Sequence, residues 1–163
     1  MAEIRAAHIA AVLLVVASNV RAAPAYQITD LGAQTEAVAI NESGTVLGTW
    51  IASQSVWTAG TWTALQTPLR FDPVAVAIDA AGEAVGYAFE NQMGDDRERA
   101  FAWKPDGHGY VLKTGLGGQS YAMDISNNGI LVGGFRPKGV YHAYTWSHGT
   151  LTDLGLPMQA VAS

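Results

Sequence analysis

Aromatic side chains are the residues of this sequence best suited to bind a ligand. The chain of 163 residues contains five Trp and six Tyr. An aromatic ring on the surface of a β-sheet can stack on a sugar ring or contact a protein partner, because it combines a large area with a polar group. Trp62 is the first candidate for such a contact. Trp57, Trp103 and Trp146 recur at one repeated position, and we therefore predict that they pack in the core.

A charged segment at residues 89–99 is the second candidate binding element. It carries Asp95, Asp96, Arg97 and Arg99, and it accounts for most of an excess of residues over the matching segments elsewhere in the chain. Carboxylate oxygens are suitable ligands for Ca²⁺, but the segment lacks the D-x-D-x-D-G spacing of a calcium loop. Two adjacent carboxylates flanked by arginines are more simply a solvated loop tip. We therefore predict a ligand-binding loop without a metal.

The remaining polar residues favour no catalytic site. His108, His142 and His148 lack the spacing of a zinc motif, and no serine stands in a G-x-S-x-G sequence. His142 is kept as a ligand-binding candidate because it stands at a repeated position. The sequence predicts no catalytic residue, no metal site and no cofactor.

An internal repeat determines which elements position these residues. Leucine followed six residues later by alanine recurs at Leu31, Leu69, Leu116 and Leu154. The repeat length is roughly 40 residues, which is typical of a four-stranded propeller blade. The predicted units are residues 31–68, 69–115 and 116–153, with a partial fourth unit at 154–163. Each unit can bury its apolar face only against a neighbouring unit.

The same strand and turn signals recur in every unit. A short apolar segment such as residues 75–78 is long enough for a buried strand, and a turn that begins with Asn, Asp or Ser and ends with Gly follows at once. A second strand with an internal glycine, a third with a tryptophan and a fourth with alternating residues complete the unit. The repeated structural positions are Gly44, Gly82 and Gly129 in the turns, Gly48, Gly86 and Gly133 in the second strands, and Trp57, Trp103 and Trp146 in the third strands.

These motifs resemble the HAF repeat of bacterial extracellular proteins. The pattern is A-x-x-I-[N/D/S]-x-x-G-x-x-[V/L]-G, then [H/R]-A-[F/Y]-x-W-x-x-G, then L-T-D-L-G. The signature His-Ala-Phe appears with one substitution at residues 99–101 and again at 142–144, whereas the first unit keeps only residues 56–57. The resemblance extends from Tyr26 to the end of the sequence. It implies a secreted, propeller-like β-repeat protein and brings no catalytic residue with it.

The first residues have the features of a secretory signal peptide. Arg5 provides a positive charge, residues 9–17 are apolar and uncharged, and small residues precede a predicted cleavage after Ala22. The apolar run is too short for a membrane-spanning helix, which needs about 20 residues. We expect residues 1–22 to be removed, residues 23–163 to form the repeat domain, and the protein to be secreted or periplasmic.

Composition excludes several classes of partner. The formal net charge is −5 and no basic cluster occurs, so nucleic acid and anionic membrane surfaces are unsuitable partners. With no cysteine, packing alone must stabilise the exported chain. About 140 residues are enough for one core.

The predicted fold is all-β, with three four-stranded antiparallel units in an incomplete propeller-like array. Closed propellers have four to eight blades, so three units leave sheet faces open. Three explanations stand: the sequence is a fragment of a longer protein, which we favour, the chain completes itself by self-association, or the units close as in a β-trefoil. We expect an exported, non-catalytic binding or scaffolding module. The alternatives are a glycan-binding domain that uses Trp62 and residues 89–99, and an enzyme acting on polysaccharide.

Overall fold

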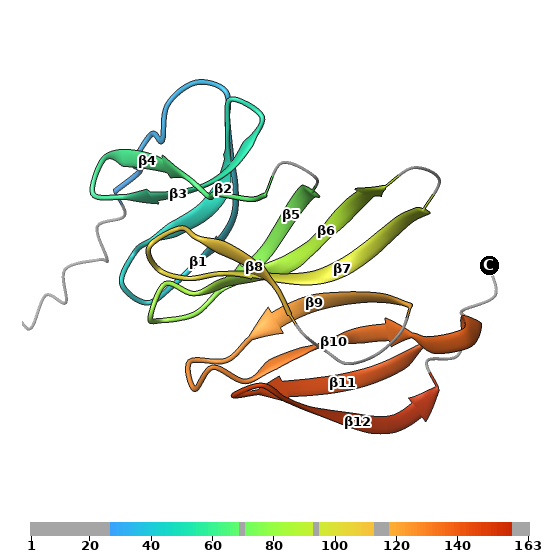
Figure 1. Ribbon diagram of the computed structural model, residues 1–163. Helices are drawn as coiled ribbons and strands as arrows, with labels where there is room; N and C mark the ends of the chain where they lie inside the picture. Colours follow the sequence, from blue (N-terminus) through green and yellow to red (C-terminus); the bar gives the residue numbers. More distant parts are fainter. Residues whose placement is uncertain (1–26, 69–70, 93–94, 113–117, 158–163) are drawn as a thin grey trace, which may run out of the picture. The chain divides into compact units, whose positions relative to one another are not determined.

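The computed structural model describes residues 27–68, 71–92, 95–112 and 118–157. The chain divides into residues 1–30 and 31–163, and all twelve described strands lie in the second part (Figure 1). The described residues contain no α-helix, only the short 3₁₀ turn η1 (Pro137–Gly139). The predicted leader, its cleavage point, Leu69, Leu116 and residues 158–163 lie outside the described residues.

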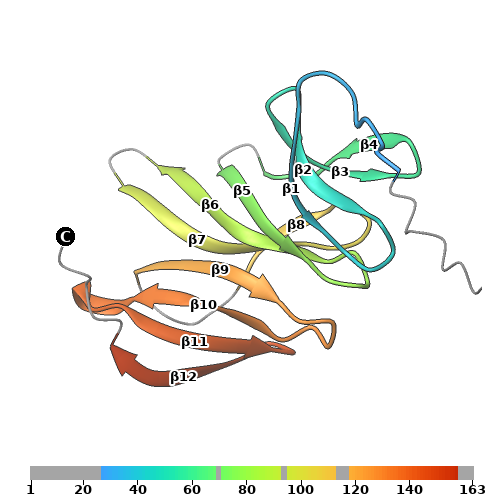
Figure 2. The same cartoon turned by 180° about the vertical axis from the view of Figure 1, so that it is seen from behind.

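The strands form three separate four-stranded antiparallel sheets, each in chain order. Figures 1 and 2 show them from opposite sides. The first sheet contains β1 (Thr35–Ile40), β2 (Val46–Trp50), β3 (Ser53–Thr58) and β4 (Thr61–Ala64). The second contains β5 (Phe71–Ile78), β6 (Ala84–Gln92), β7 (Asp95–Trp103) and β8 (Gly109–Val111). The third contains β9 (Gln119–Ile125), β10 (Leu131–Arg136), β11 (His142–Ser147) and β12 (Thr150–Pro157).

This topology confirms the predicted fold class. Three four-stranded antiparallel units were expected, and the described residues form three such sheets. The trefoil-like alternative is wrong, because that closure needs strands of different units to join in one barrel, and each sheet here pairs only with itself. Residues 154–157, which the sequence assigns to a fourth unit, continue β12 of the third sheet.

A four-residue turn joins the first two strands of each sheet. In the second sheet the N–H of Gly82 donates to the carbonyl oxygen of Asp79 at 3.1 Å, and Asp79 Oδ1 accepts the N–H of Glu83 at 2.8 Å. Gly82 has φ +89°, a conformation that costs glycine little. The same hydrogen bonds and positive φ recur with Asn41 and Gly44 in the first sheet and with Ser126 and Gly129 in the third.

Each first strand contains a bulge that brings it close to a glycine in the second strand. In the second sheet the register shifts between Ala75 and Ala77, and a Cβ on Gly86 would overlap the carbonyl oxygen of Val74. Gly48 would meet Glu36 and Gly133 would meet Tyr121 in the same way. A glycine inside a strand is typical of such a close backbone approach.

Two rows of side chains, one on each face, cross every sheet. We call them the front row and the back row. The front rows are Ile40, Val46, Trp57 and Trp62 in the first sheet, Ile78, Ala84, Trp103 and Gly109 in the second, and Ile125, Leu131, Trp146 and Leu151 in the third. The back rows are Ala39, Leu47, Val56 and Thr63, then Ala77, Val85, Ala102 and Tyr110, then Asp124, Val132, Thr145 and Thr152.

Two apolar cores form where the back row of one sheet meets the front row of the next. The first core joins Leu47 of the first sheet to Trp103 of the second. The second core joins Val85 of the second sheet to Leu131 of the third. The second sheet is therefore buried on both faces, as expected for stacked repeat units.

Candidate functional site

The binding residues predicted from the sequence lie on three different sheets. Trp62 is in β4, Arg97 and Arg99 are in β7, and His142 begins β11. Among the described residues no hydrogen bond or ion pair joins Trp62, Arg99 and His142 to one another. The predicted residues therefore do not form one site.

Trp62 is half-buried and already engaged. Its indole Nε1 donates a hydrogen bond to the carbonyl oxygen of Leu31 at 2.9 Å, and its ring stands opposite Trp57 in the strand register. The matching position in the second sheet is Gly109, because Trp103 pairs with Gly109. Trp103 is fully buried, whereas Trp57 and Trp146 are half-buried.

The charged segment at residues 89–99 is mostly strand, and its prediction as a loop is wrong. It extends the hairpin of β6 and β7, where Phe89 pairs with Glu98 and Glu90 pairs with Arg97. Arg99 Nε lies 3.1 Å from Glu90 Oε2, and Arg99 Nη1 donates to the carbonyl oxygen of Gly118 at 2.7 Å. These contacts hold Arg99 in a structural position. The side chains of Asp95 and Asp96 lie outside the described residues.

His142 forms an ion-pair geometry with Asp153 on the neighbouring strand. Its Nδ1 lies 3.1 Å from Asp153 Oδ2, and its ring lies 5.0 Å from the ring of Phe135. The candidate ligand-binding nitrogen of His142 is therefore already engaged by a carboxylate. No hydroxyl side chain among the described residues bonds to this pair, so it does not form a nucleophilic triad of the serine type.

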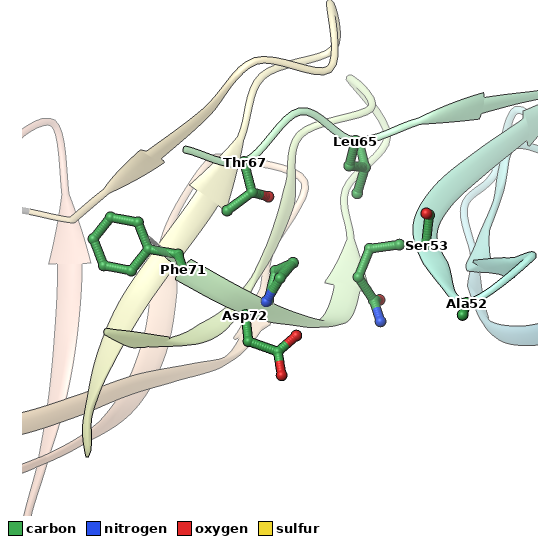
Figure 3. A pocket seen from close by; sticks show the side chains of 8 residues that line it. Ala52, Ser53, Leu65, Thr67, Phe71 and Asp72 are labelled. Carbon is green, nitrogen blue, oxygen red and sulfur yellow. The ribbon is translucent and has the colours of Figure 1, made fainter. Parts of the chain in front are cut away.

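One hollow lies between the first and second sheets. It is about 330 Å³ and is lined by Ala52, Ser53, Gln54, Leu65, Thr67, Phe71, Asp72 and Pro73. Figure 3 shows Ala52 and Ser53 on one side of it and Phe71 on the other. Two of its polar groups are already used, since Gln54 Oε1 accepts the N–H of Ala75 and Thr67 Oγ1 accepts the indole N–H of Trp103. Asp72 is its one carboxylate.

A second hollow, which we call the tyrosine hollow, lies where β6 and β7 meet the third sheet. It is also about 330 Å³, and its lining is Tyr87, Glu98, Tyr121, Met123 and Tyr141. Tyr87 and Glu98 stand on the long β6–β7 hairpin, while Tyr121 and Met123 stand on β9. Three aromatic rings and one carboxylate therefore come from segments far apart in the sequence.

Neighbouring residues hold the rings of the tyrosine hollow in place. The guanidinium of Arg136 stands 4.9 Å from the centre of the Tyr141 ring, a cation–π geometry. A Cβ on Gly134 would overlap the Tyr121 ring, so the glycine makes room for that ring. Tyr87 meets Phe89 edge to face, with ring centres 5.8 Å apart. These contacts restrict the orientations that the three rings can adopt.

The polar groups of the tyrosine hollow remain available. Burial raises the pKa of Tyr121 above its ordinary value, and the nearby Tyr141 hydroxyl and Glu98 carboxylate raise that pKa further. The Tyr121 hydroxyl therefore stays protonated at neutral pH and can donate a hydrogen bond. Glu98 is half-buried and has no hydrogen-bond or ion-pair partner among the described residues.

The sequence predicted a binding element at residues 89–99, which includes Glu98, but not the tyrosines of this hollow. Tyr121 and Tyr141 are two of the six tyrosines, and nothing in the sequence alone selects them as binding residues. The sequence signal that could have found this hollow is a residue that differs from its equivalents in the other units. Tyr87 of β6 occupies the position held by Thr49 in the first sheet and by Gly134 in the third. The residue at this position of the repeat therefore differs in every sheet.

The described residues contain no group of three or more His, Cys, Asp or Glu that could hold a metal ion. In the part of the chain that the structure describes, no helix is both long and apolar enough to cross a membrane. No family model matches this chain, and neither curated proteins nor solved structures gave a match.

Proposed function

We propose that this protein is a non-catalytic binding module of the periplasm or cell exterior and that its ligand occupies the tyrosine hollow. The observation that supports the proposal is the convergence of Tyr87, Tyr121 and Tyr141 around one hollow beside the extended β6–β7 hairpin. Binding elements in repeat proteins are often the segments that exceed their siblings. Export is supported by the leader features of residues 1–22 and by the resemblance to the HAF repeat.

The chemistry of the tyrosine hollow favours a neutral glycan as ligand. Tyrosine rings stack on the apolar faces of sugars while their hydroxyls form hydrogen bonds. Glu98 can accept hydrogen bonds from sugar hydroxyls, and the protonated Tyr121 can donate one. The formal net charge of −5 disfavours strongly anionic polymers.

Binding fits the tyrosine hollow better than hydrolysis does. Glycoside hydrolysis ordinarily uses two carboxyl groups on opposite sides of the scissile bond. The lining of the tyrosine hollow contains one, Glu98. The polysaccharide-active enzyme is therefore the less favoured alternative.

Titration of the purified chain with soluble neutral oligosaccharides tests this proposal. Calorimetry should detect binding to at least one β-linked glucan, xylan or chitin fragment. Tyr141→Ala and Tyr87→Ala should each weaken that binding about fivefold or more, the loss expected when an aromatic residue that contributes over ~1 kcal/mol is truncated. The matched control is Trp50→Ala, which removes an exposed ring from β2 outside the hollow.

Three outcomes would count against the proposal. Absence of binding to every glycan would remove the ligand class. Equal affinity in the two tyrosine variants and the native chain would move the site elsewhere. Release of reducing ends from the bound polymer, lost in Glu98→Gln, would establish an enzyme instead of a binding module.

A further inference from the structure

The front row of the first sheet is open at Ile40 although Val46, the next residue of the row, is 7% exposed. Ile40 is 67% exposed, whereas Ile78 and Ile125, at the same position in the other sheets, are 9% and 6% exposed. Trp57 is half-buried, as is Trp146 in the covered front row of the third sheet, so the exposure of Ile40 is the observation that marks the open side. The residue is isoleucine in all three sheets, so the difference in exposure comes from the neighbouring sheet. The second and third sheets have a sheet packed on this side, and the first sheet has none among the described residues.

The back row of the third sheet is also open, because no described sheet packs on it. Val132 is 41% exposed, whereas Leu47 and Val85, at the same position in the first and second sheets, are 0% exposed. Leu47 belongs to the core shared with the second sheet, and Val85 to the core shared with the third. Val132 has no such core among the described residues.

We propose that a second copy of this chain covers both surfaces, by packing its back row of the third sheet on the front row of the first sheet. The contact continues an interface that the molecule already uses twice, since back row meets front row at both internal cores. A surface that packs in this way within the chain is complementary to the matching open row of a second copy.

The three described sheets fit a closed dimer. Two copies of the three described sheets give six, which lies within the four to eight blades of closed propellers, whereas three copies give nine. Two identical contacts related by a two-fold axis close such a ring. The turns after β1, β5 and β9 converge, as they do around the axis of a ring: Asn41 Nδ2 donates to Asp79 O at 2.8 Å, and Asn127 Nδ2 donates to Glu42 Oε1 at 3.3 Å.

Light scattering on the purified chain tests the proposal, with the single-chain mass taken from mass spectrometry. The native protein should have twice that mass. Ile40→Lys and Val132→Glu should each weaken the dimer at least tenfold, because a charge then lies in each of the two contacts. Val140→Lys is the matched control, since Val140 is 50% exposed but lies outside every strand.

Mixing the two variants distinguishes this contact from any symmetric face-to-face contact. A mixed dimer of Ile40→Lys and Val132→Glu has one native contact and one in which lysine meets glutamate. The mixture should therefore dimerise more strongly than either variant alone. Near-ultraviolet circular dichroism of each variant must match the native spectrum, which excludes loss of folding as the cause.

A native protein that is monomeric at all accessible concentrations overturns the proposal. A dimer that neither variant weakens overturns it as well, because the contact then lies elsewhere. Growth into assemblies of indefinite mass overturns the closed ring. Failure of the mixture to recover overturns the head-to-tail contact.

Discussion

At the scale of single residues, Tyr144 should make the free energy of unfolding fall as the pH rises into the alkaline range. Its side chain is fully buried, and its hydroxyl donates to the carbonyl oxygen of Tyr121 at 3.2 Å. Burial, followed by the proximity of the Tyr121 hydroxyl, raises the pKa of Tyr144 well above the ordinary value of 10.0. A raised folded-state pKa in an acidic group means that folding is favoured below the unfolded pKa and loses that advantage as the pH rises above it.

The corresponding prediction compares native protein with Tyr144→Phe. At neutral pH the variant should be less stable, because it lacks the hydroxyl hydrogen bond, which is worth about 1 kcal/mol. Above pH 10 the difference in free energy of unfolding should shrink. Only the native sequence has a tyrosine here, and its ionisation stabilises the unfolded state and so lowers the free energy of unfolding. Urea denaturation at pH 7 and at several values above 10 measures this, and a difference that grows with pH would contradict it.

The tryptophans mark the limit of prediction at the residue scale. Their equivalence was evident from the repeated spacing, and Trp103 is fully buried as a core residue should be. Trp57 and Trp146 stand at the same repeated position but are only half-buried, although Trp146 packs against the second core. Burial is a property of the neighbouring unit, so it cannot be read from the unit that carries the residue.

At the scale of elements, the glycine opposite each bulge is a constraint on the hairpin. Replacing Gly86 with valine should lower the free energy of unfolding by on the order of 1–3 kcal/mol, because the new Cβ would overlap the carbonyl oxygen of Val74. Chemical denaturation measures the loss. Thr63→Val is the control, since it places the same valine side chain at an exposed position of β4 where a Cβ is already present. An unchanged Gly86→Val midpoint would mean that the bulge relaxes without cost.

Most elements could be predicted because each has a local signal. Alternating or apolar runs gave the strands, and a polar residue followed three positions later by glycine gave the turns, as at Asp79 and Gly82. The β6–β7 hairpin was predicted as a loop because its charges resemble a solvated tip. Cross-strand pairing of Glu90 with Arg97 accommodates those charges within a strand, and such pairing depends on a register that no local pattern fixes.

At the scale of the whole molecule, the tyrosine hollow exists only because the second and third sheets pack together. Tyr87 and Tyr121 lie on different sheets, and Gly134 leaves room for the second ring. Neither the spacing nor the composition predicts that juxtaposition, which follows from the angle at which one repeat meets the next. The fold was therefore more predictable than the site.

The open back row of the third sheet is more polar than the other back rows, with Asp124 and Thr145 at apolar positions of the repeat, and Asp124 yields the last prediction. Asp124 stands where Ala39 and Ala77 stand in the other sheets, so a carboxylate must lose water when a second copy covers this row. Removing that carboxylate in Asp124→Ala should tighten the dimer at least tenfold, since burying a polar group costs on the order of 1–3 kcal/mol and each of the two contacts contains one Asp124. Asp106→Ala is the control, because it removes the same charge from the exposed turn before β8, away from both rows.

Sedimentation equilibrium of the two variants separates a local effect from an effect of net charge. Tighter association in both variants would assign the effect to net charge. Weaker association in Asp124→Ala would show that the carboxylate has a partner across the contact.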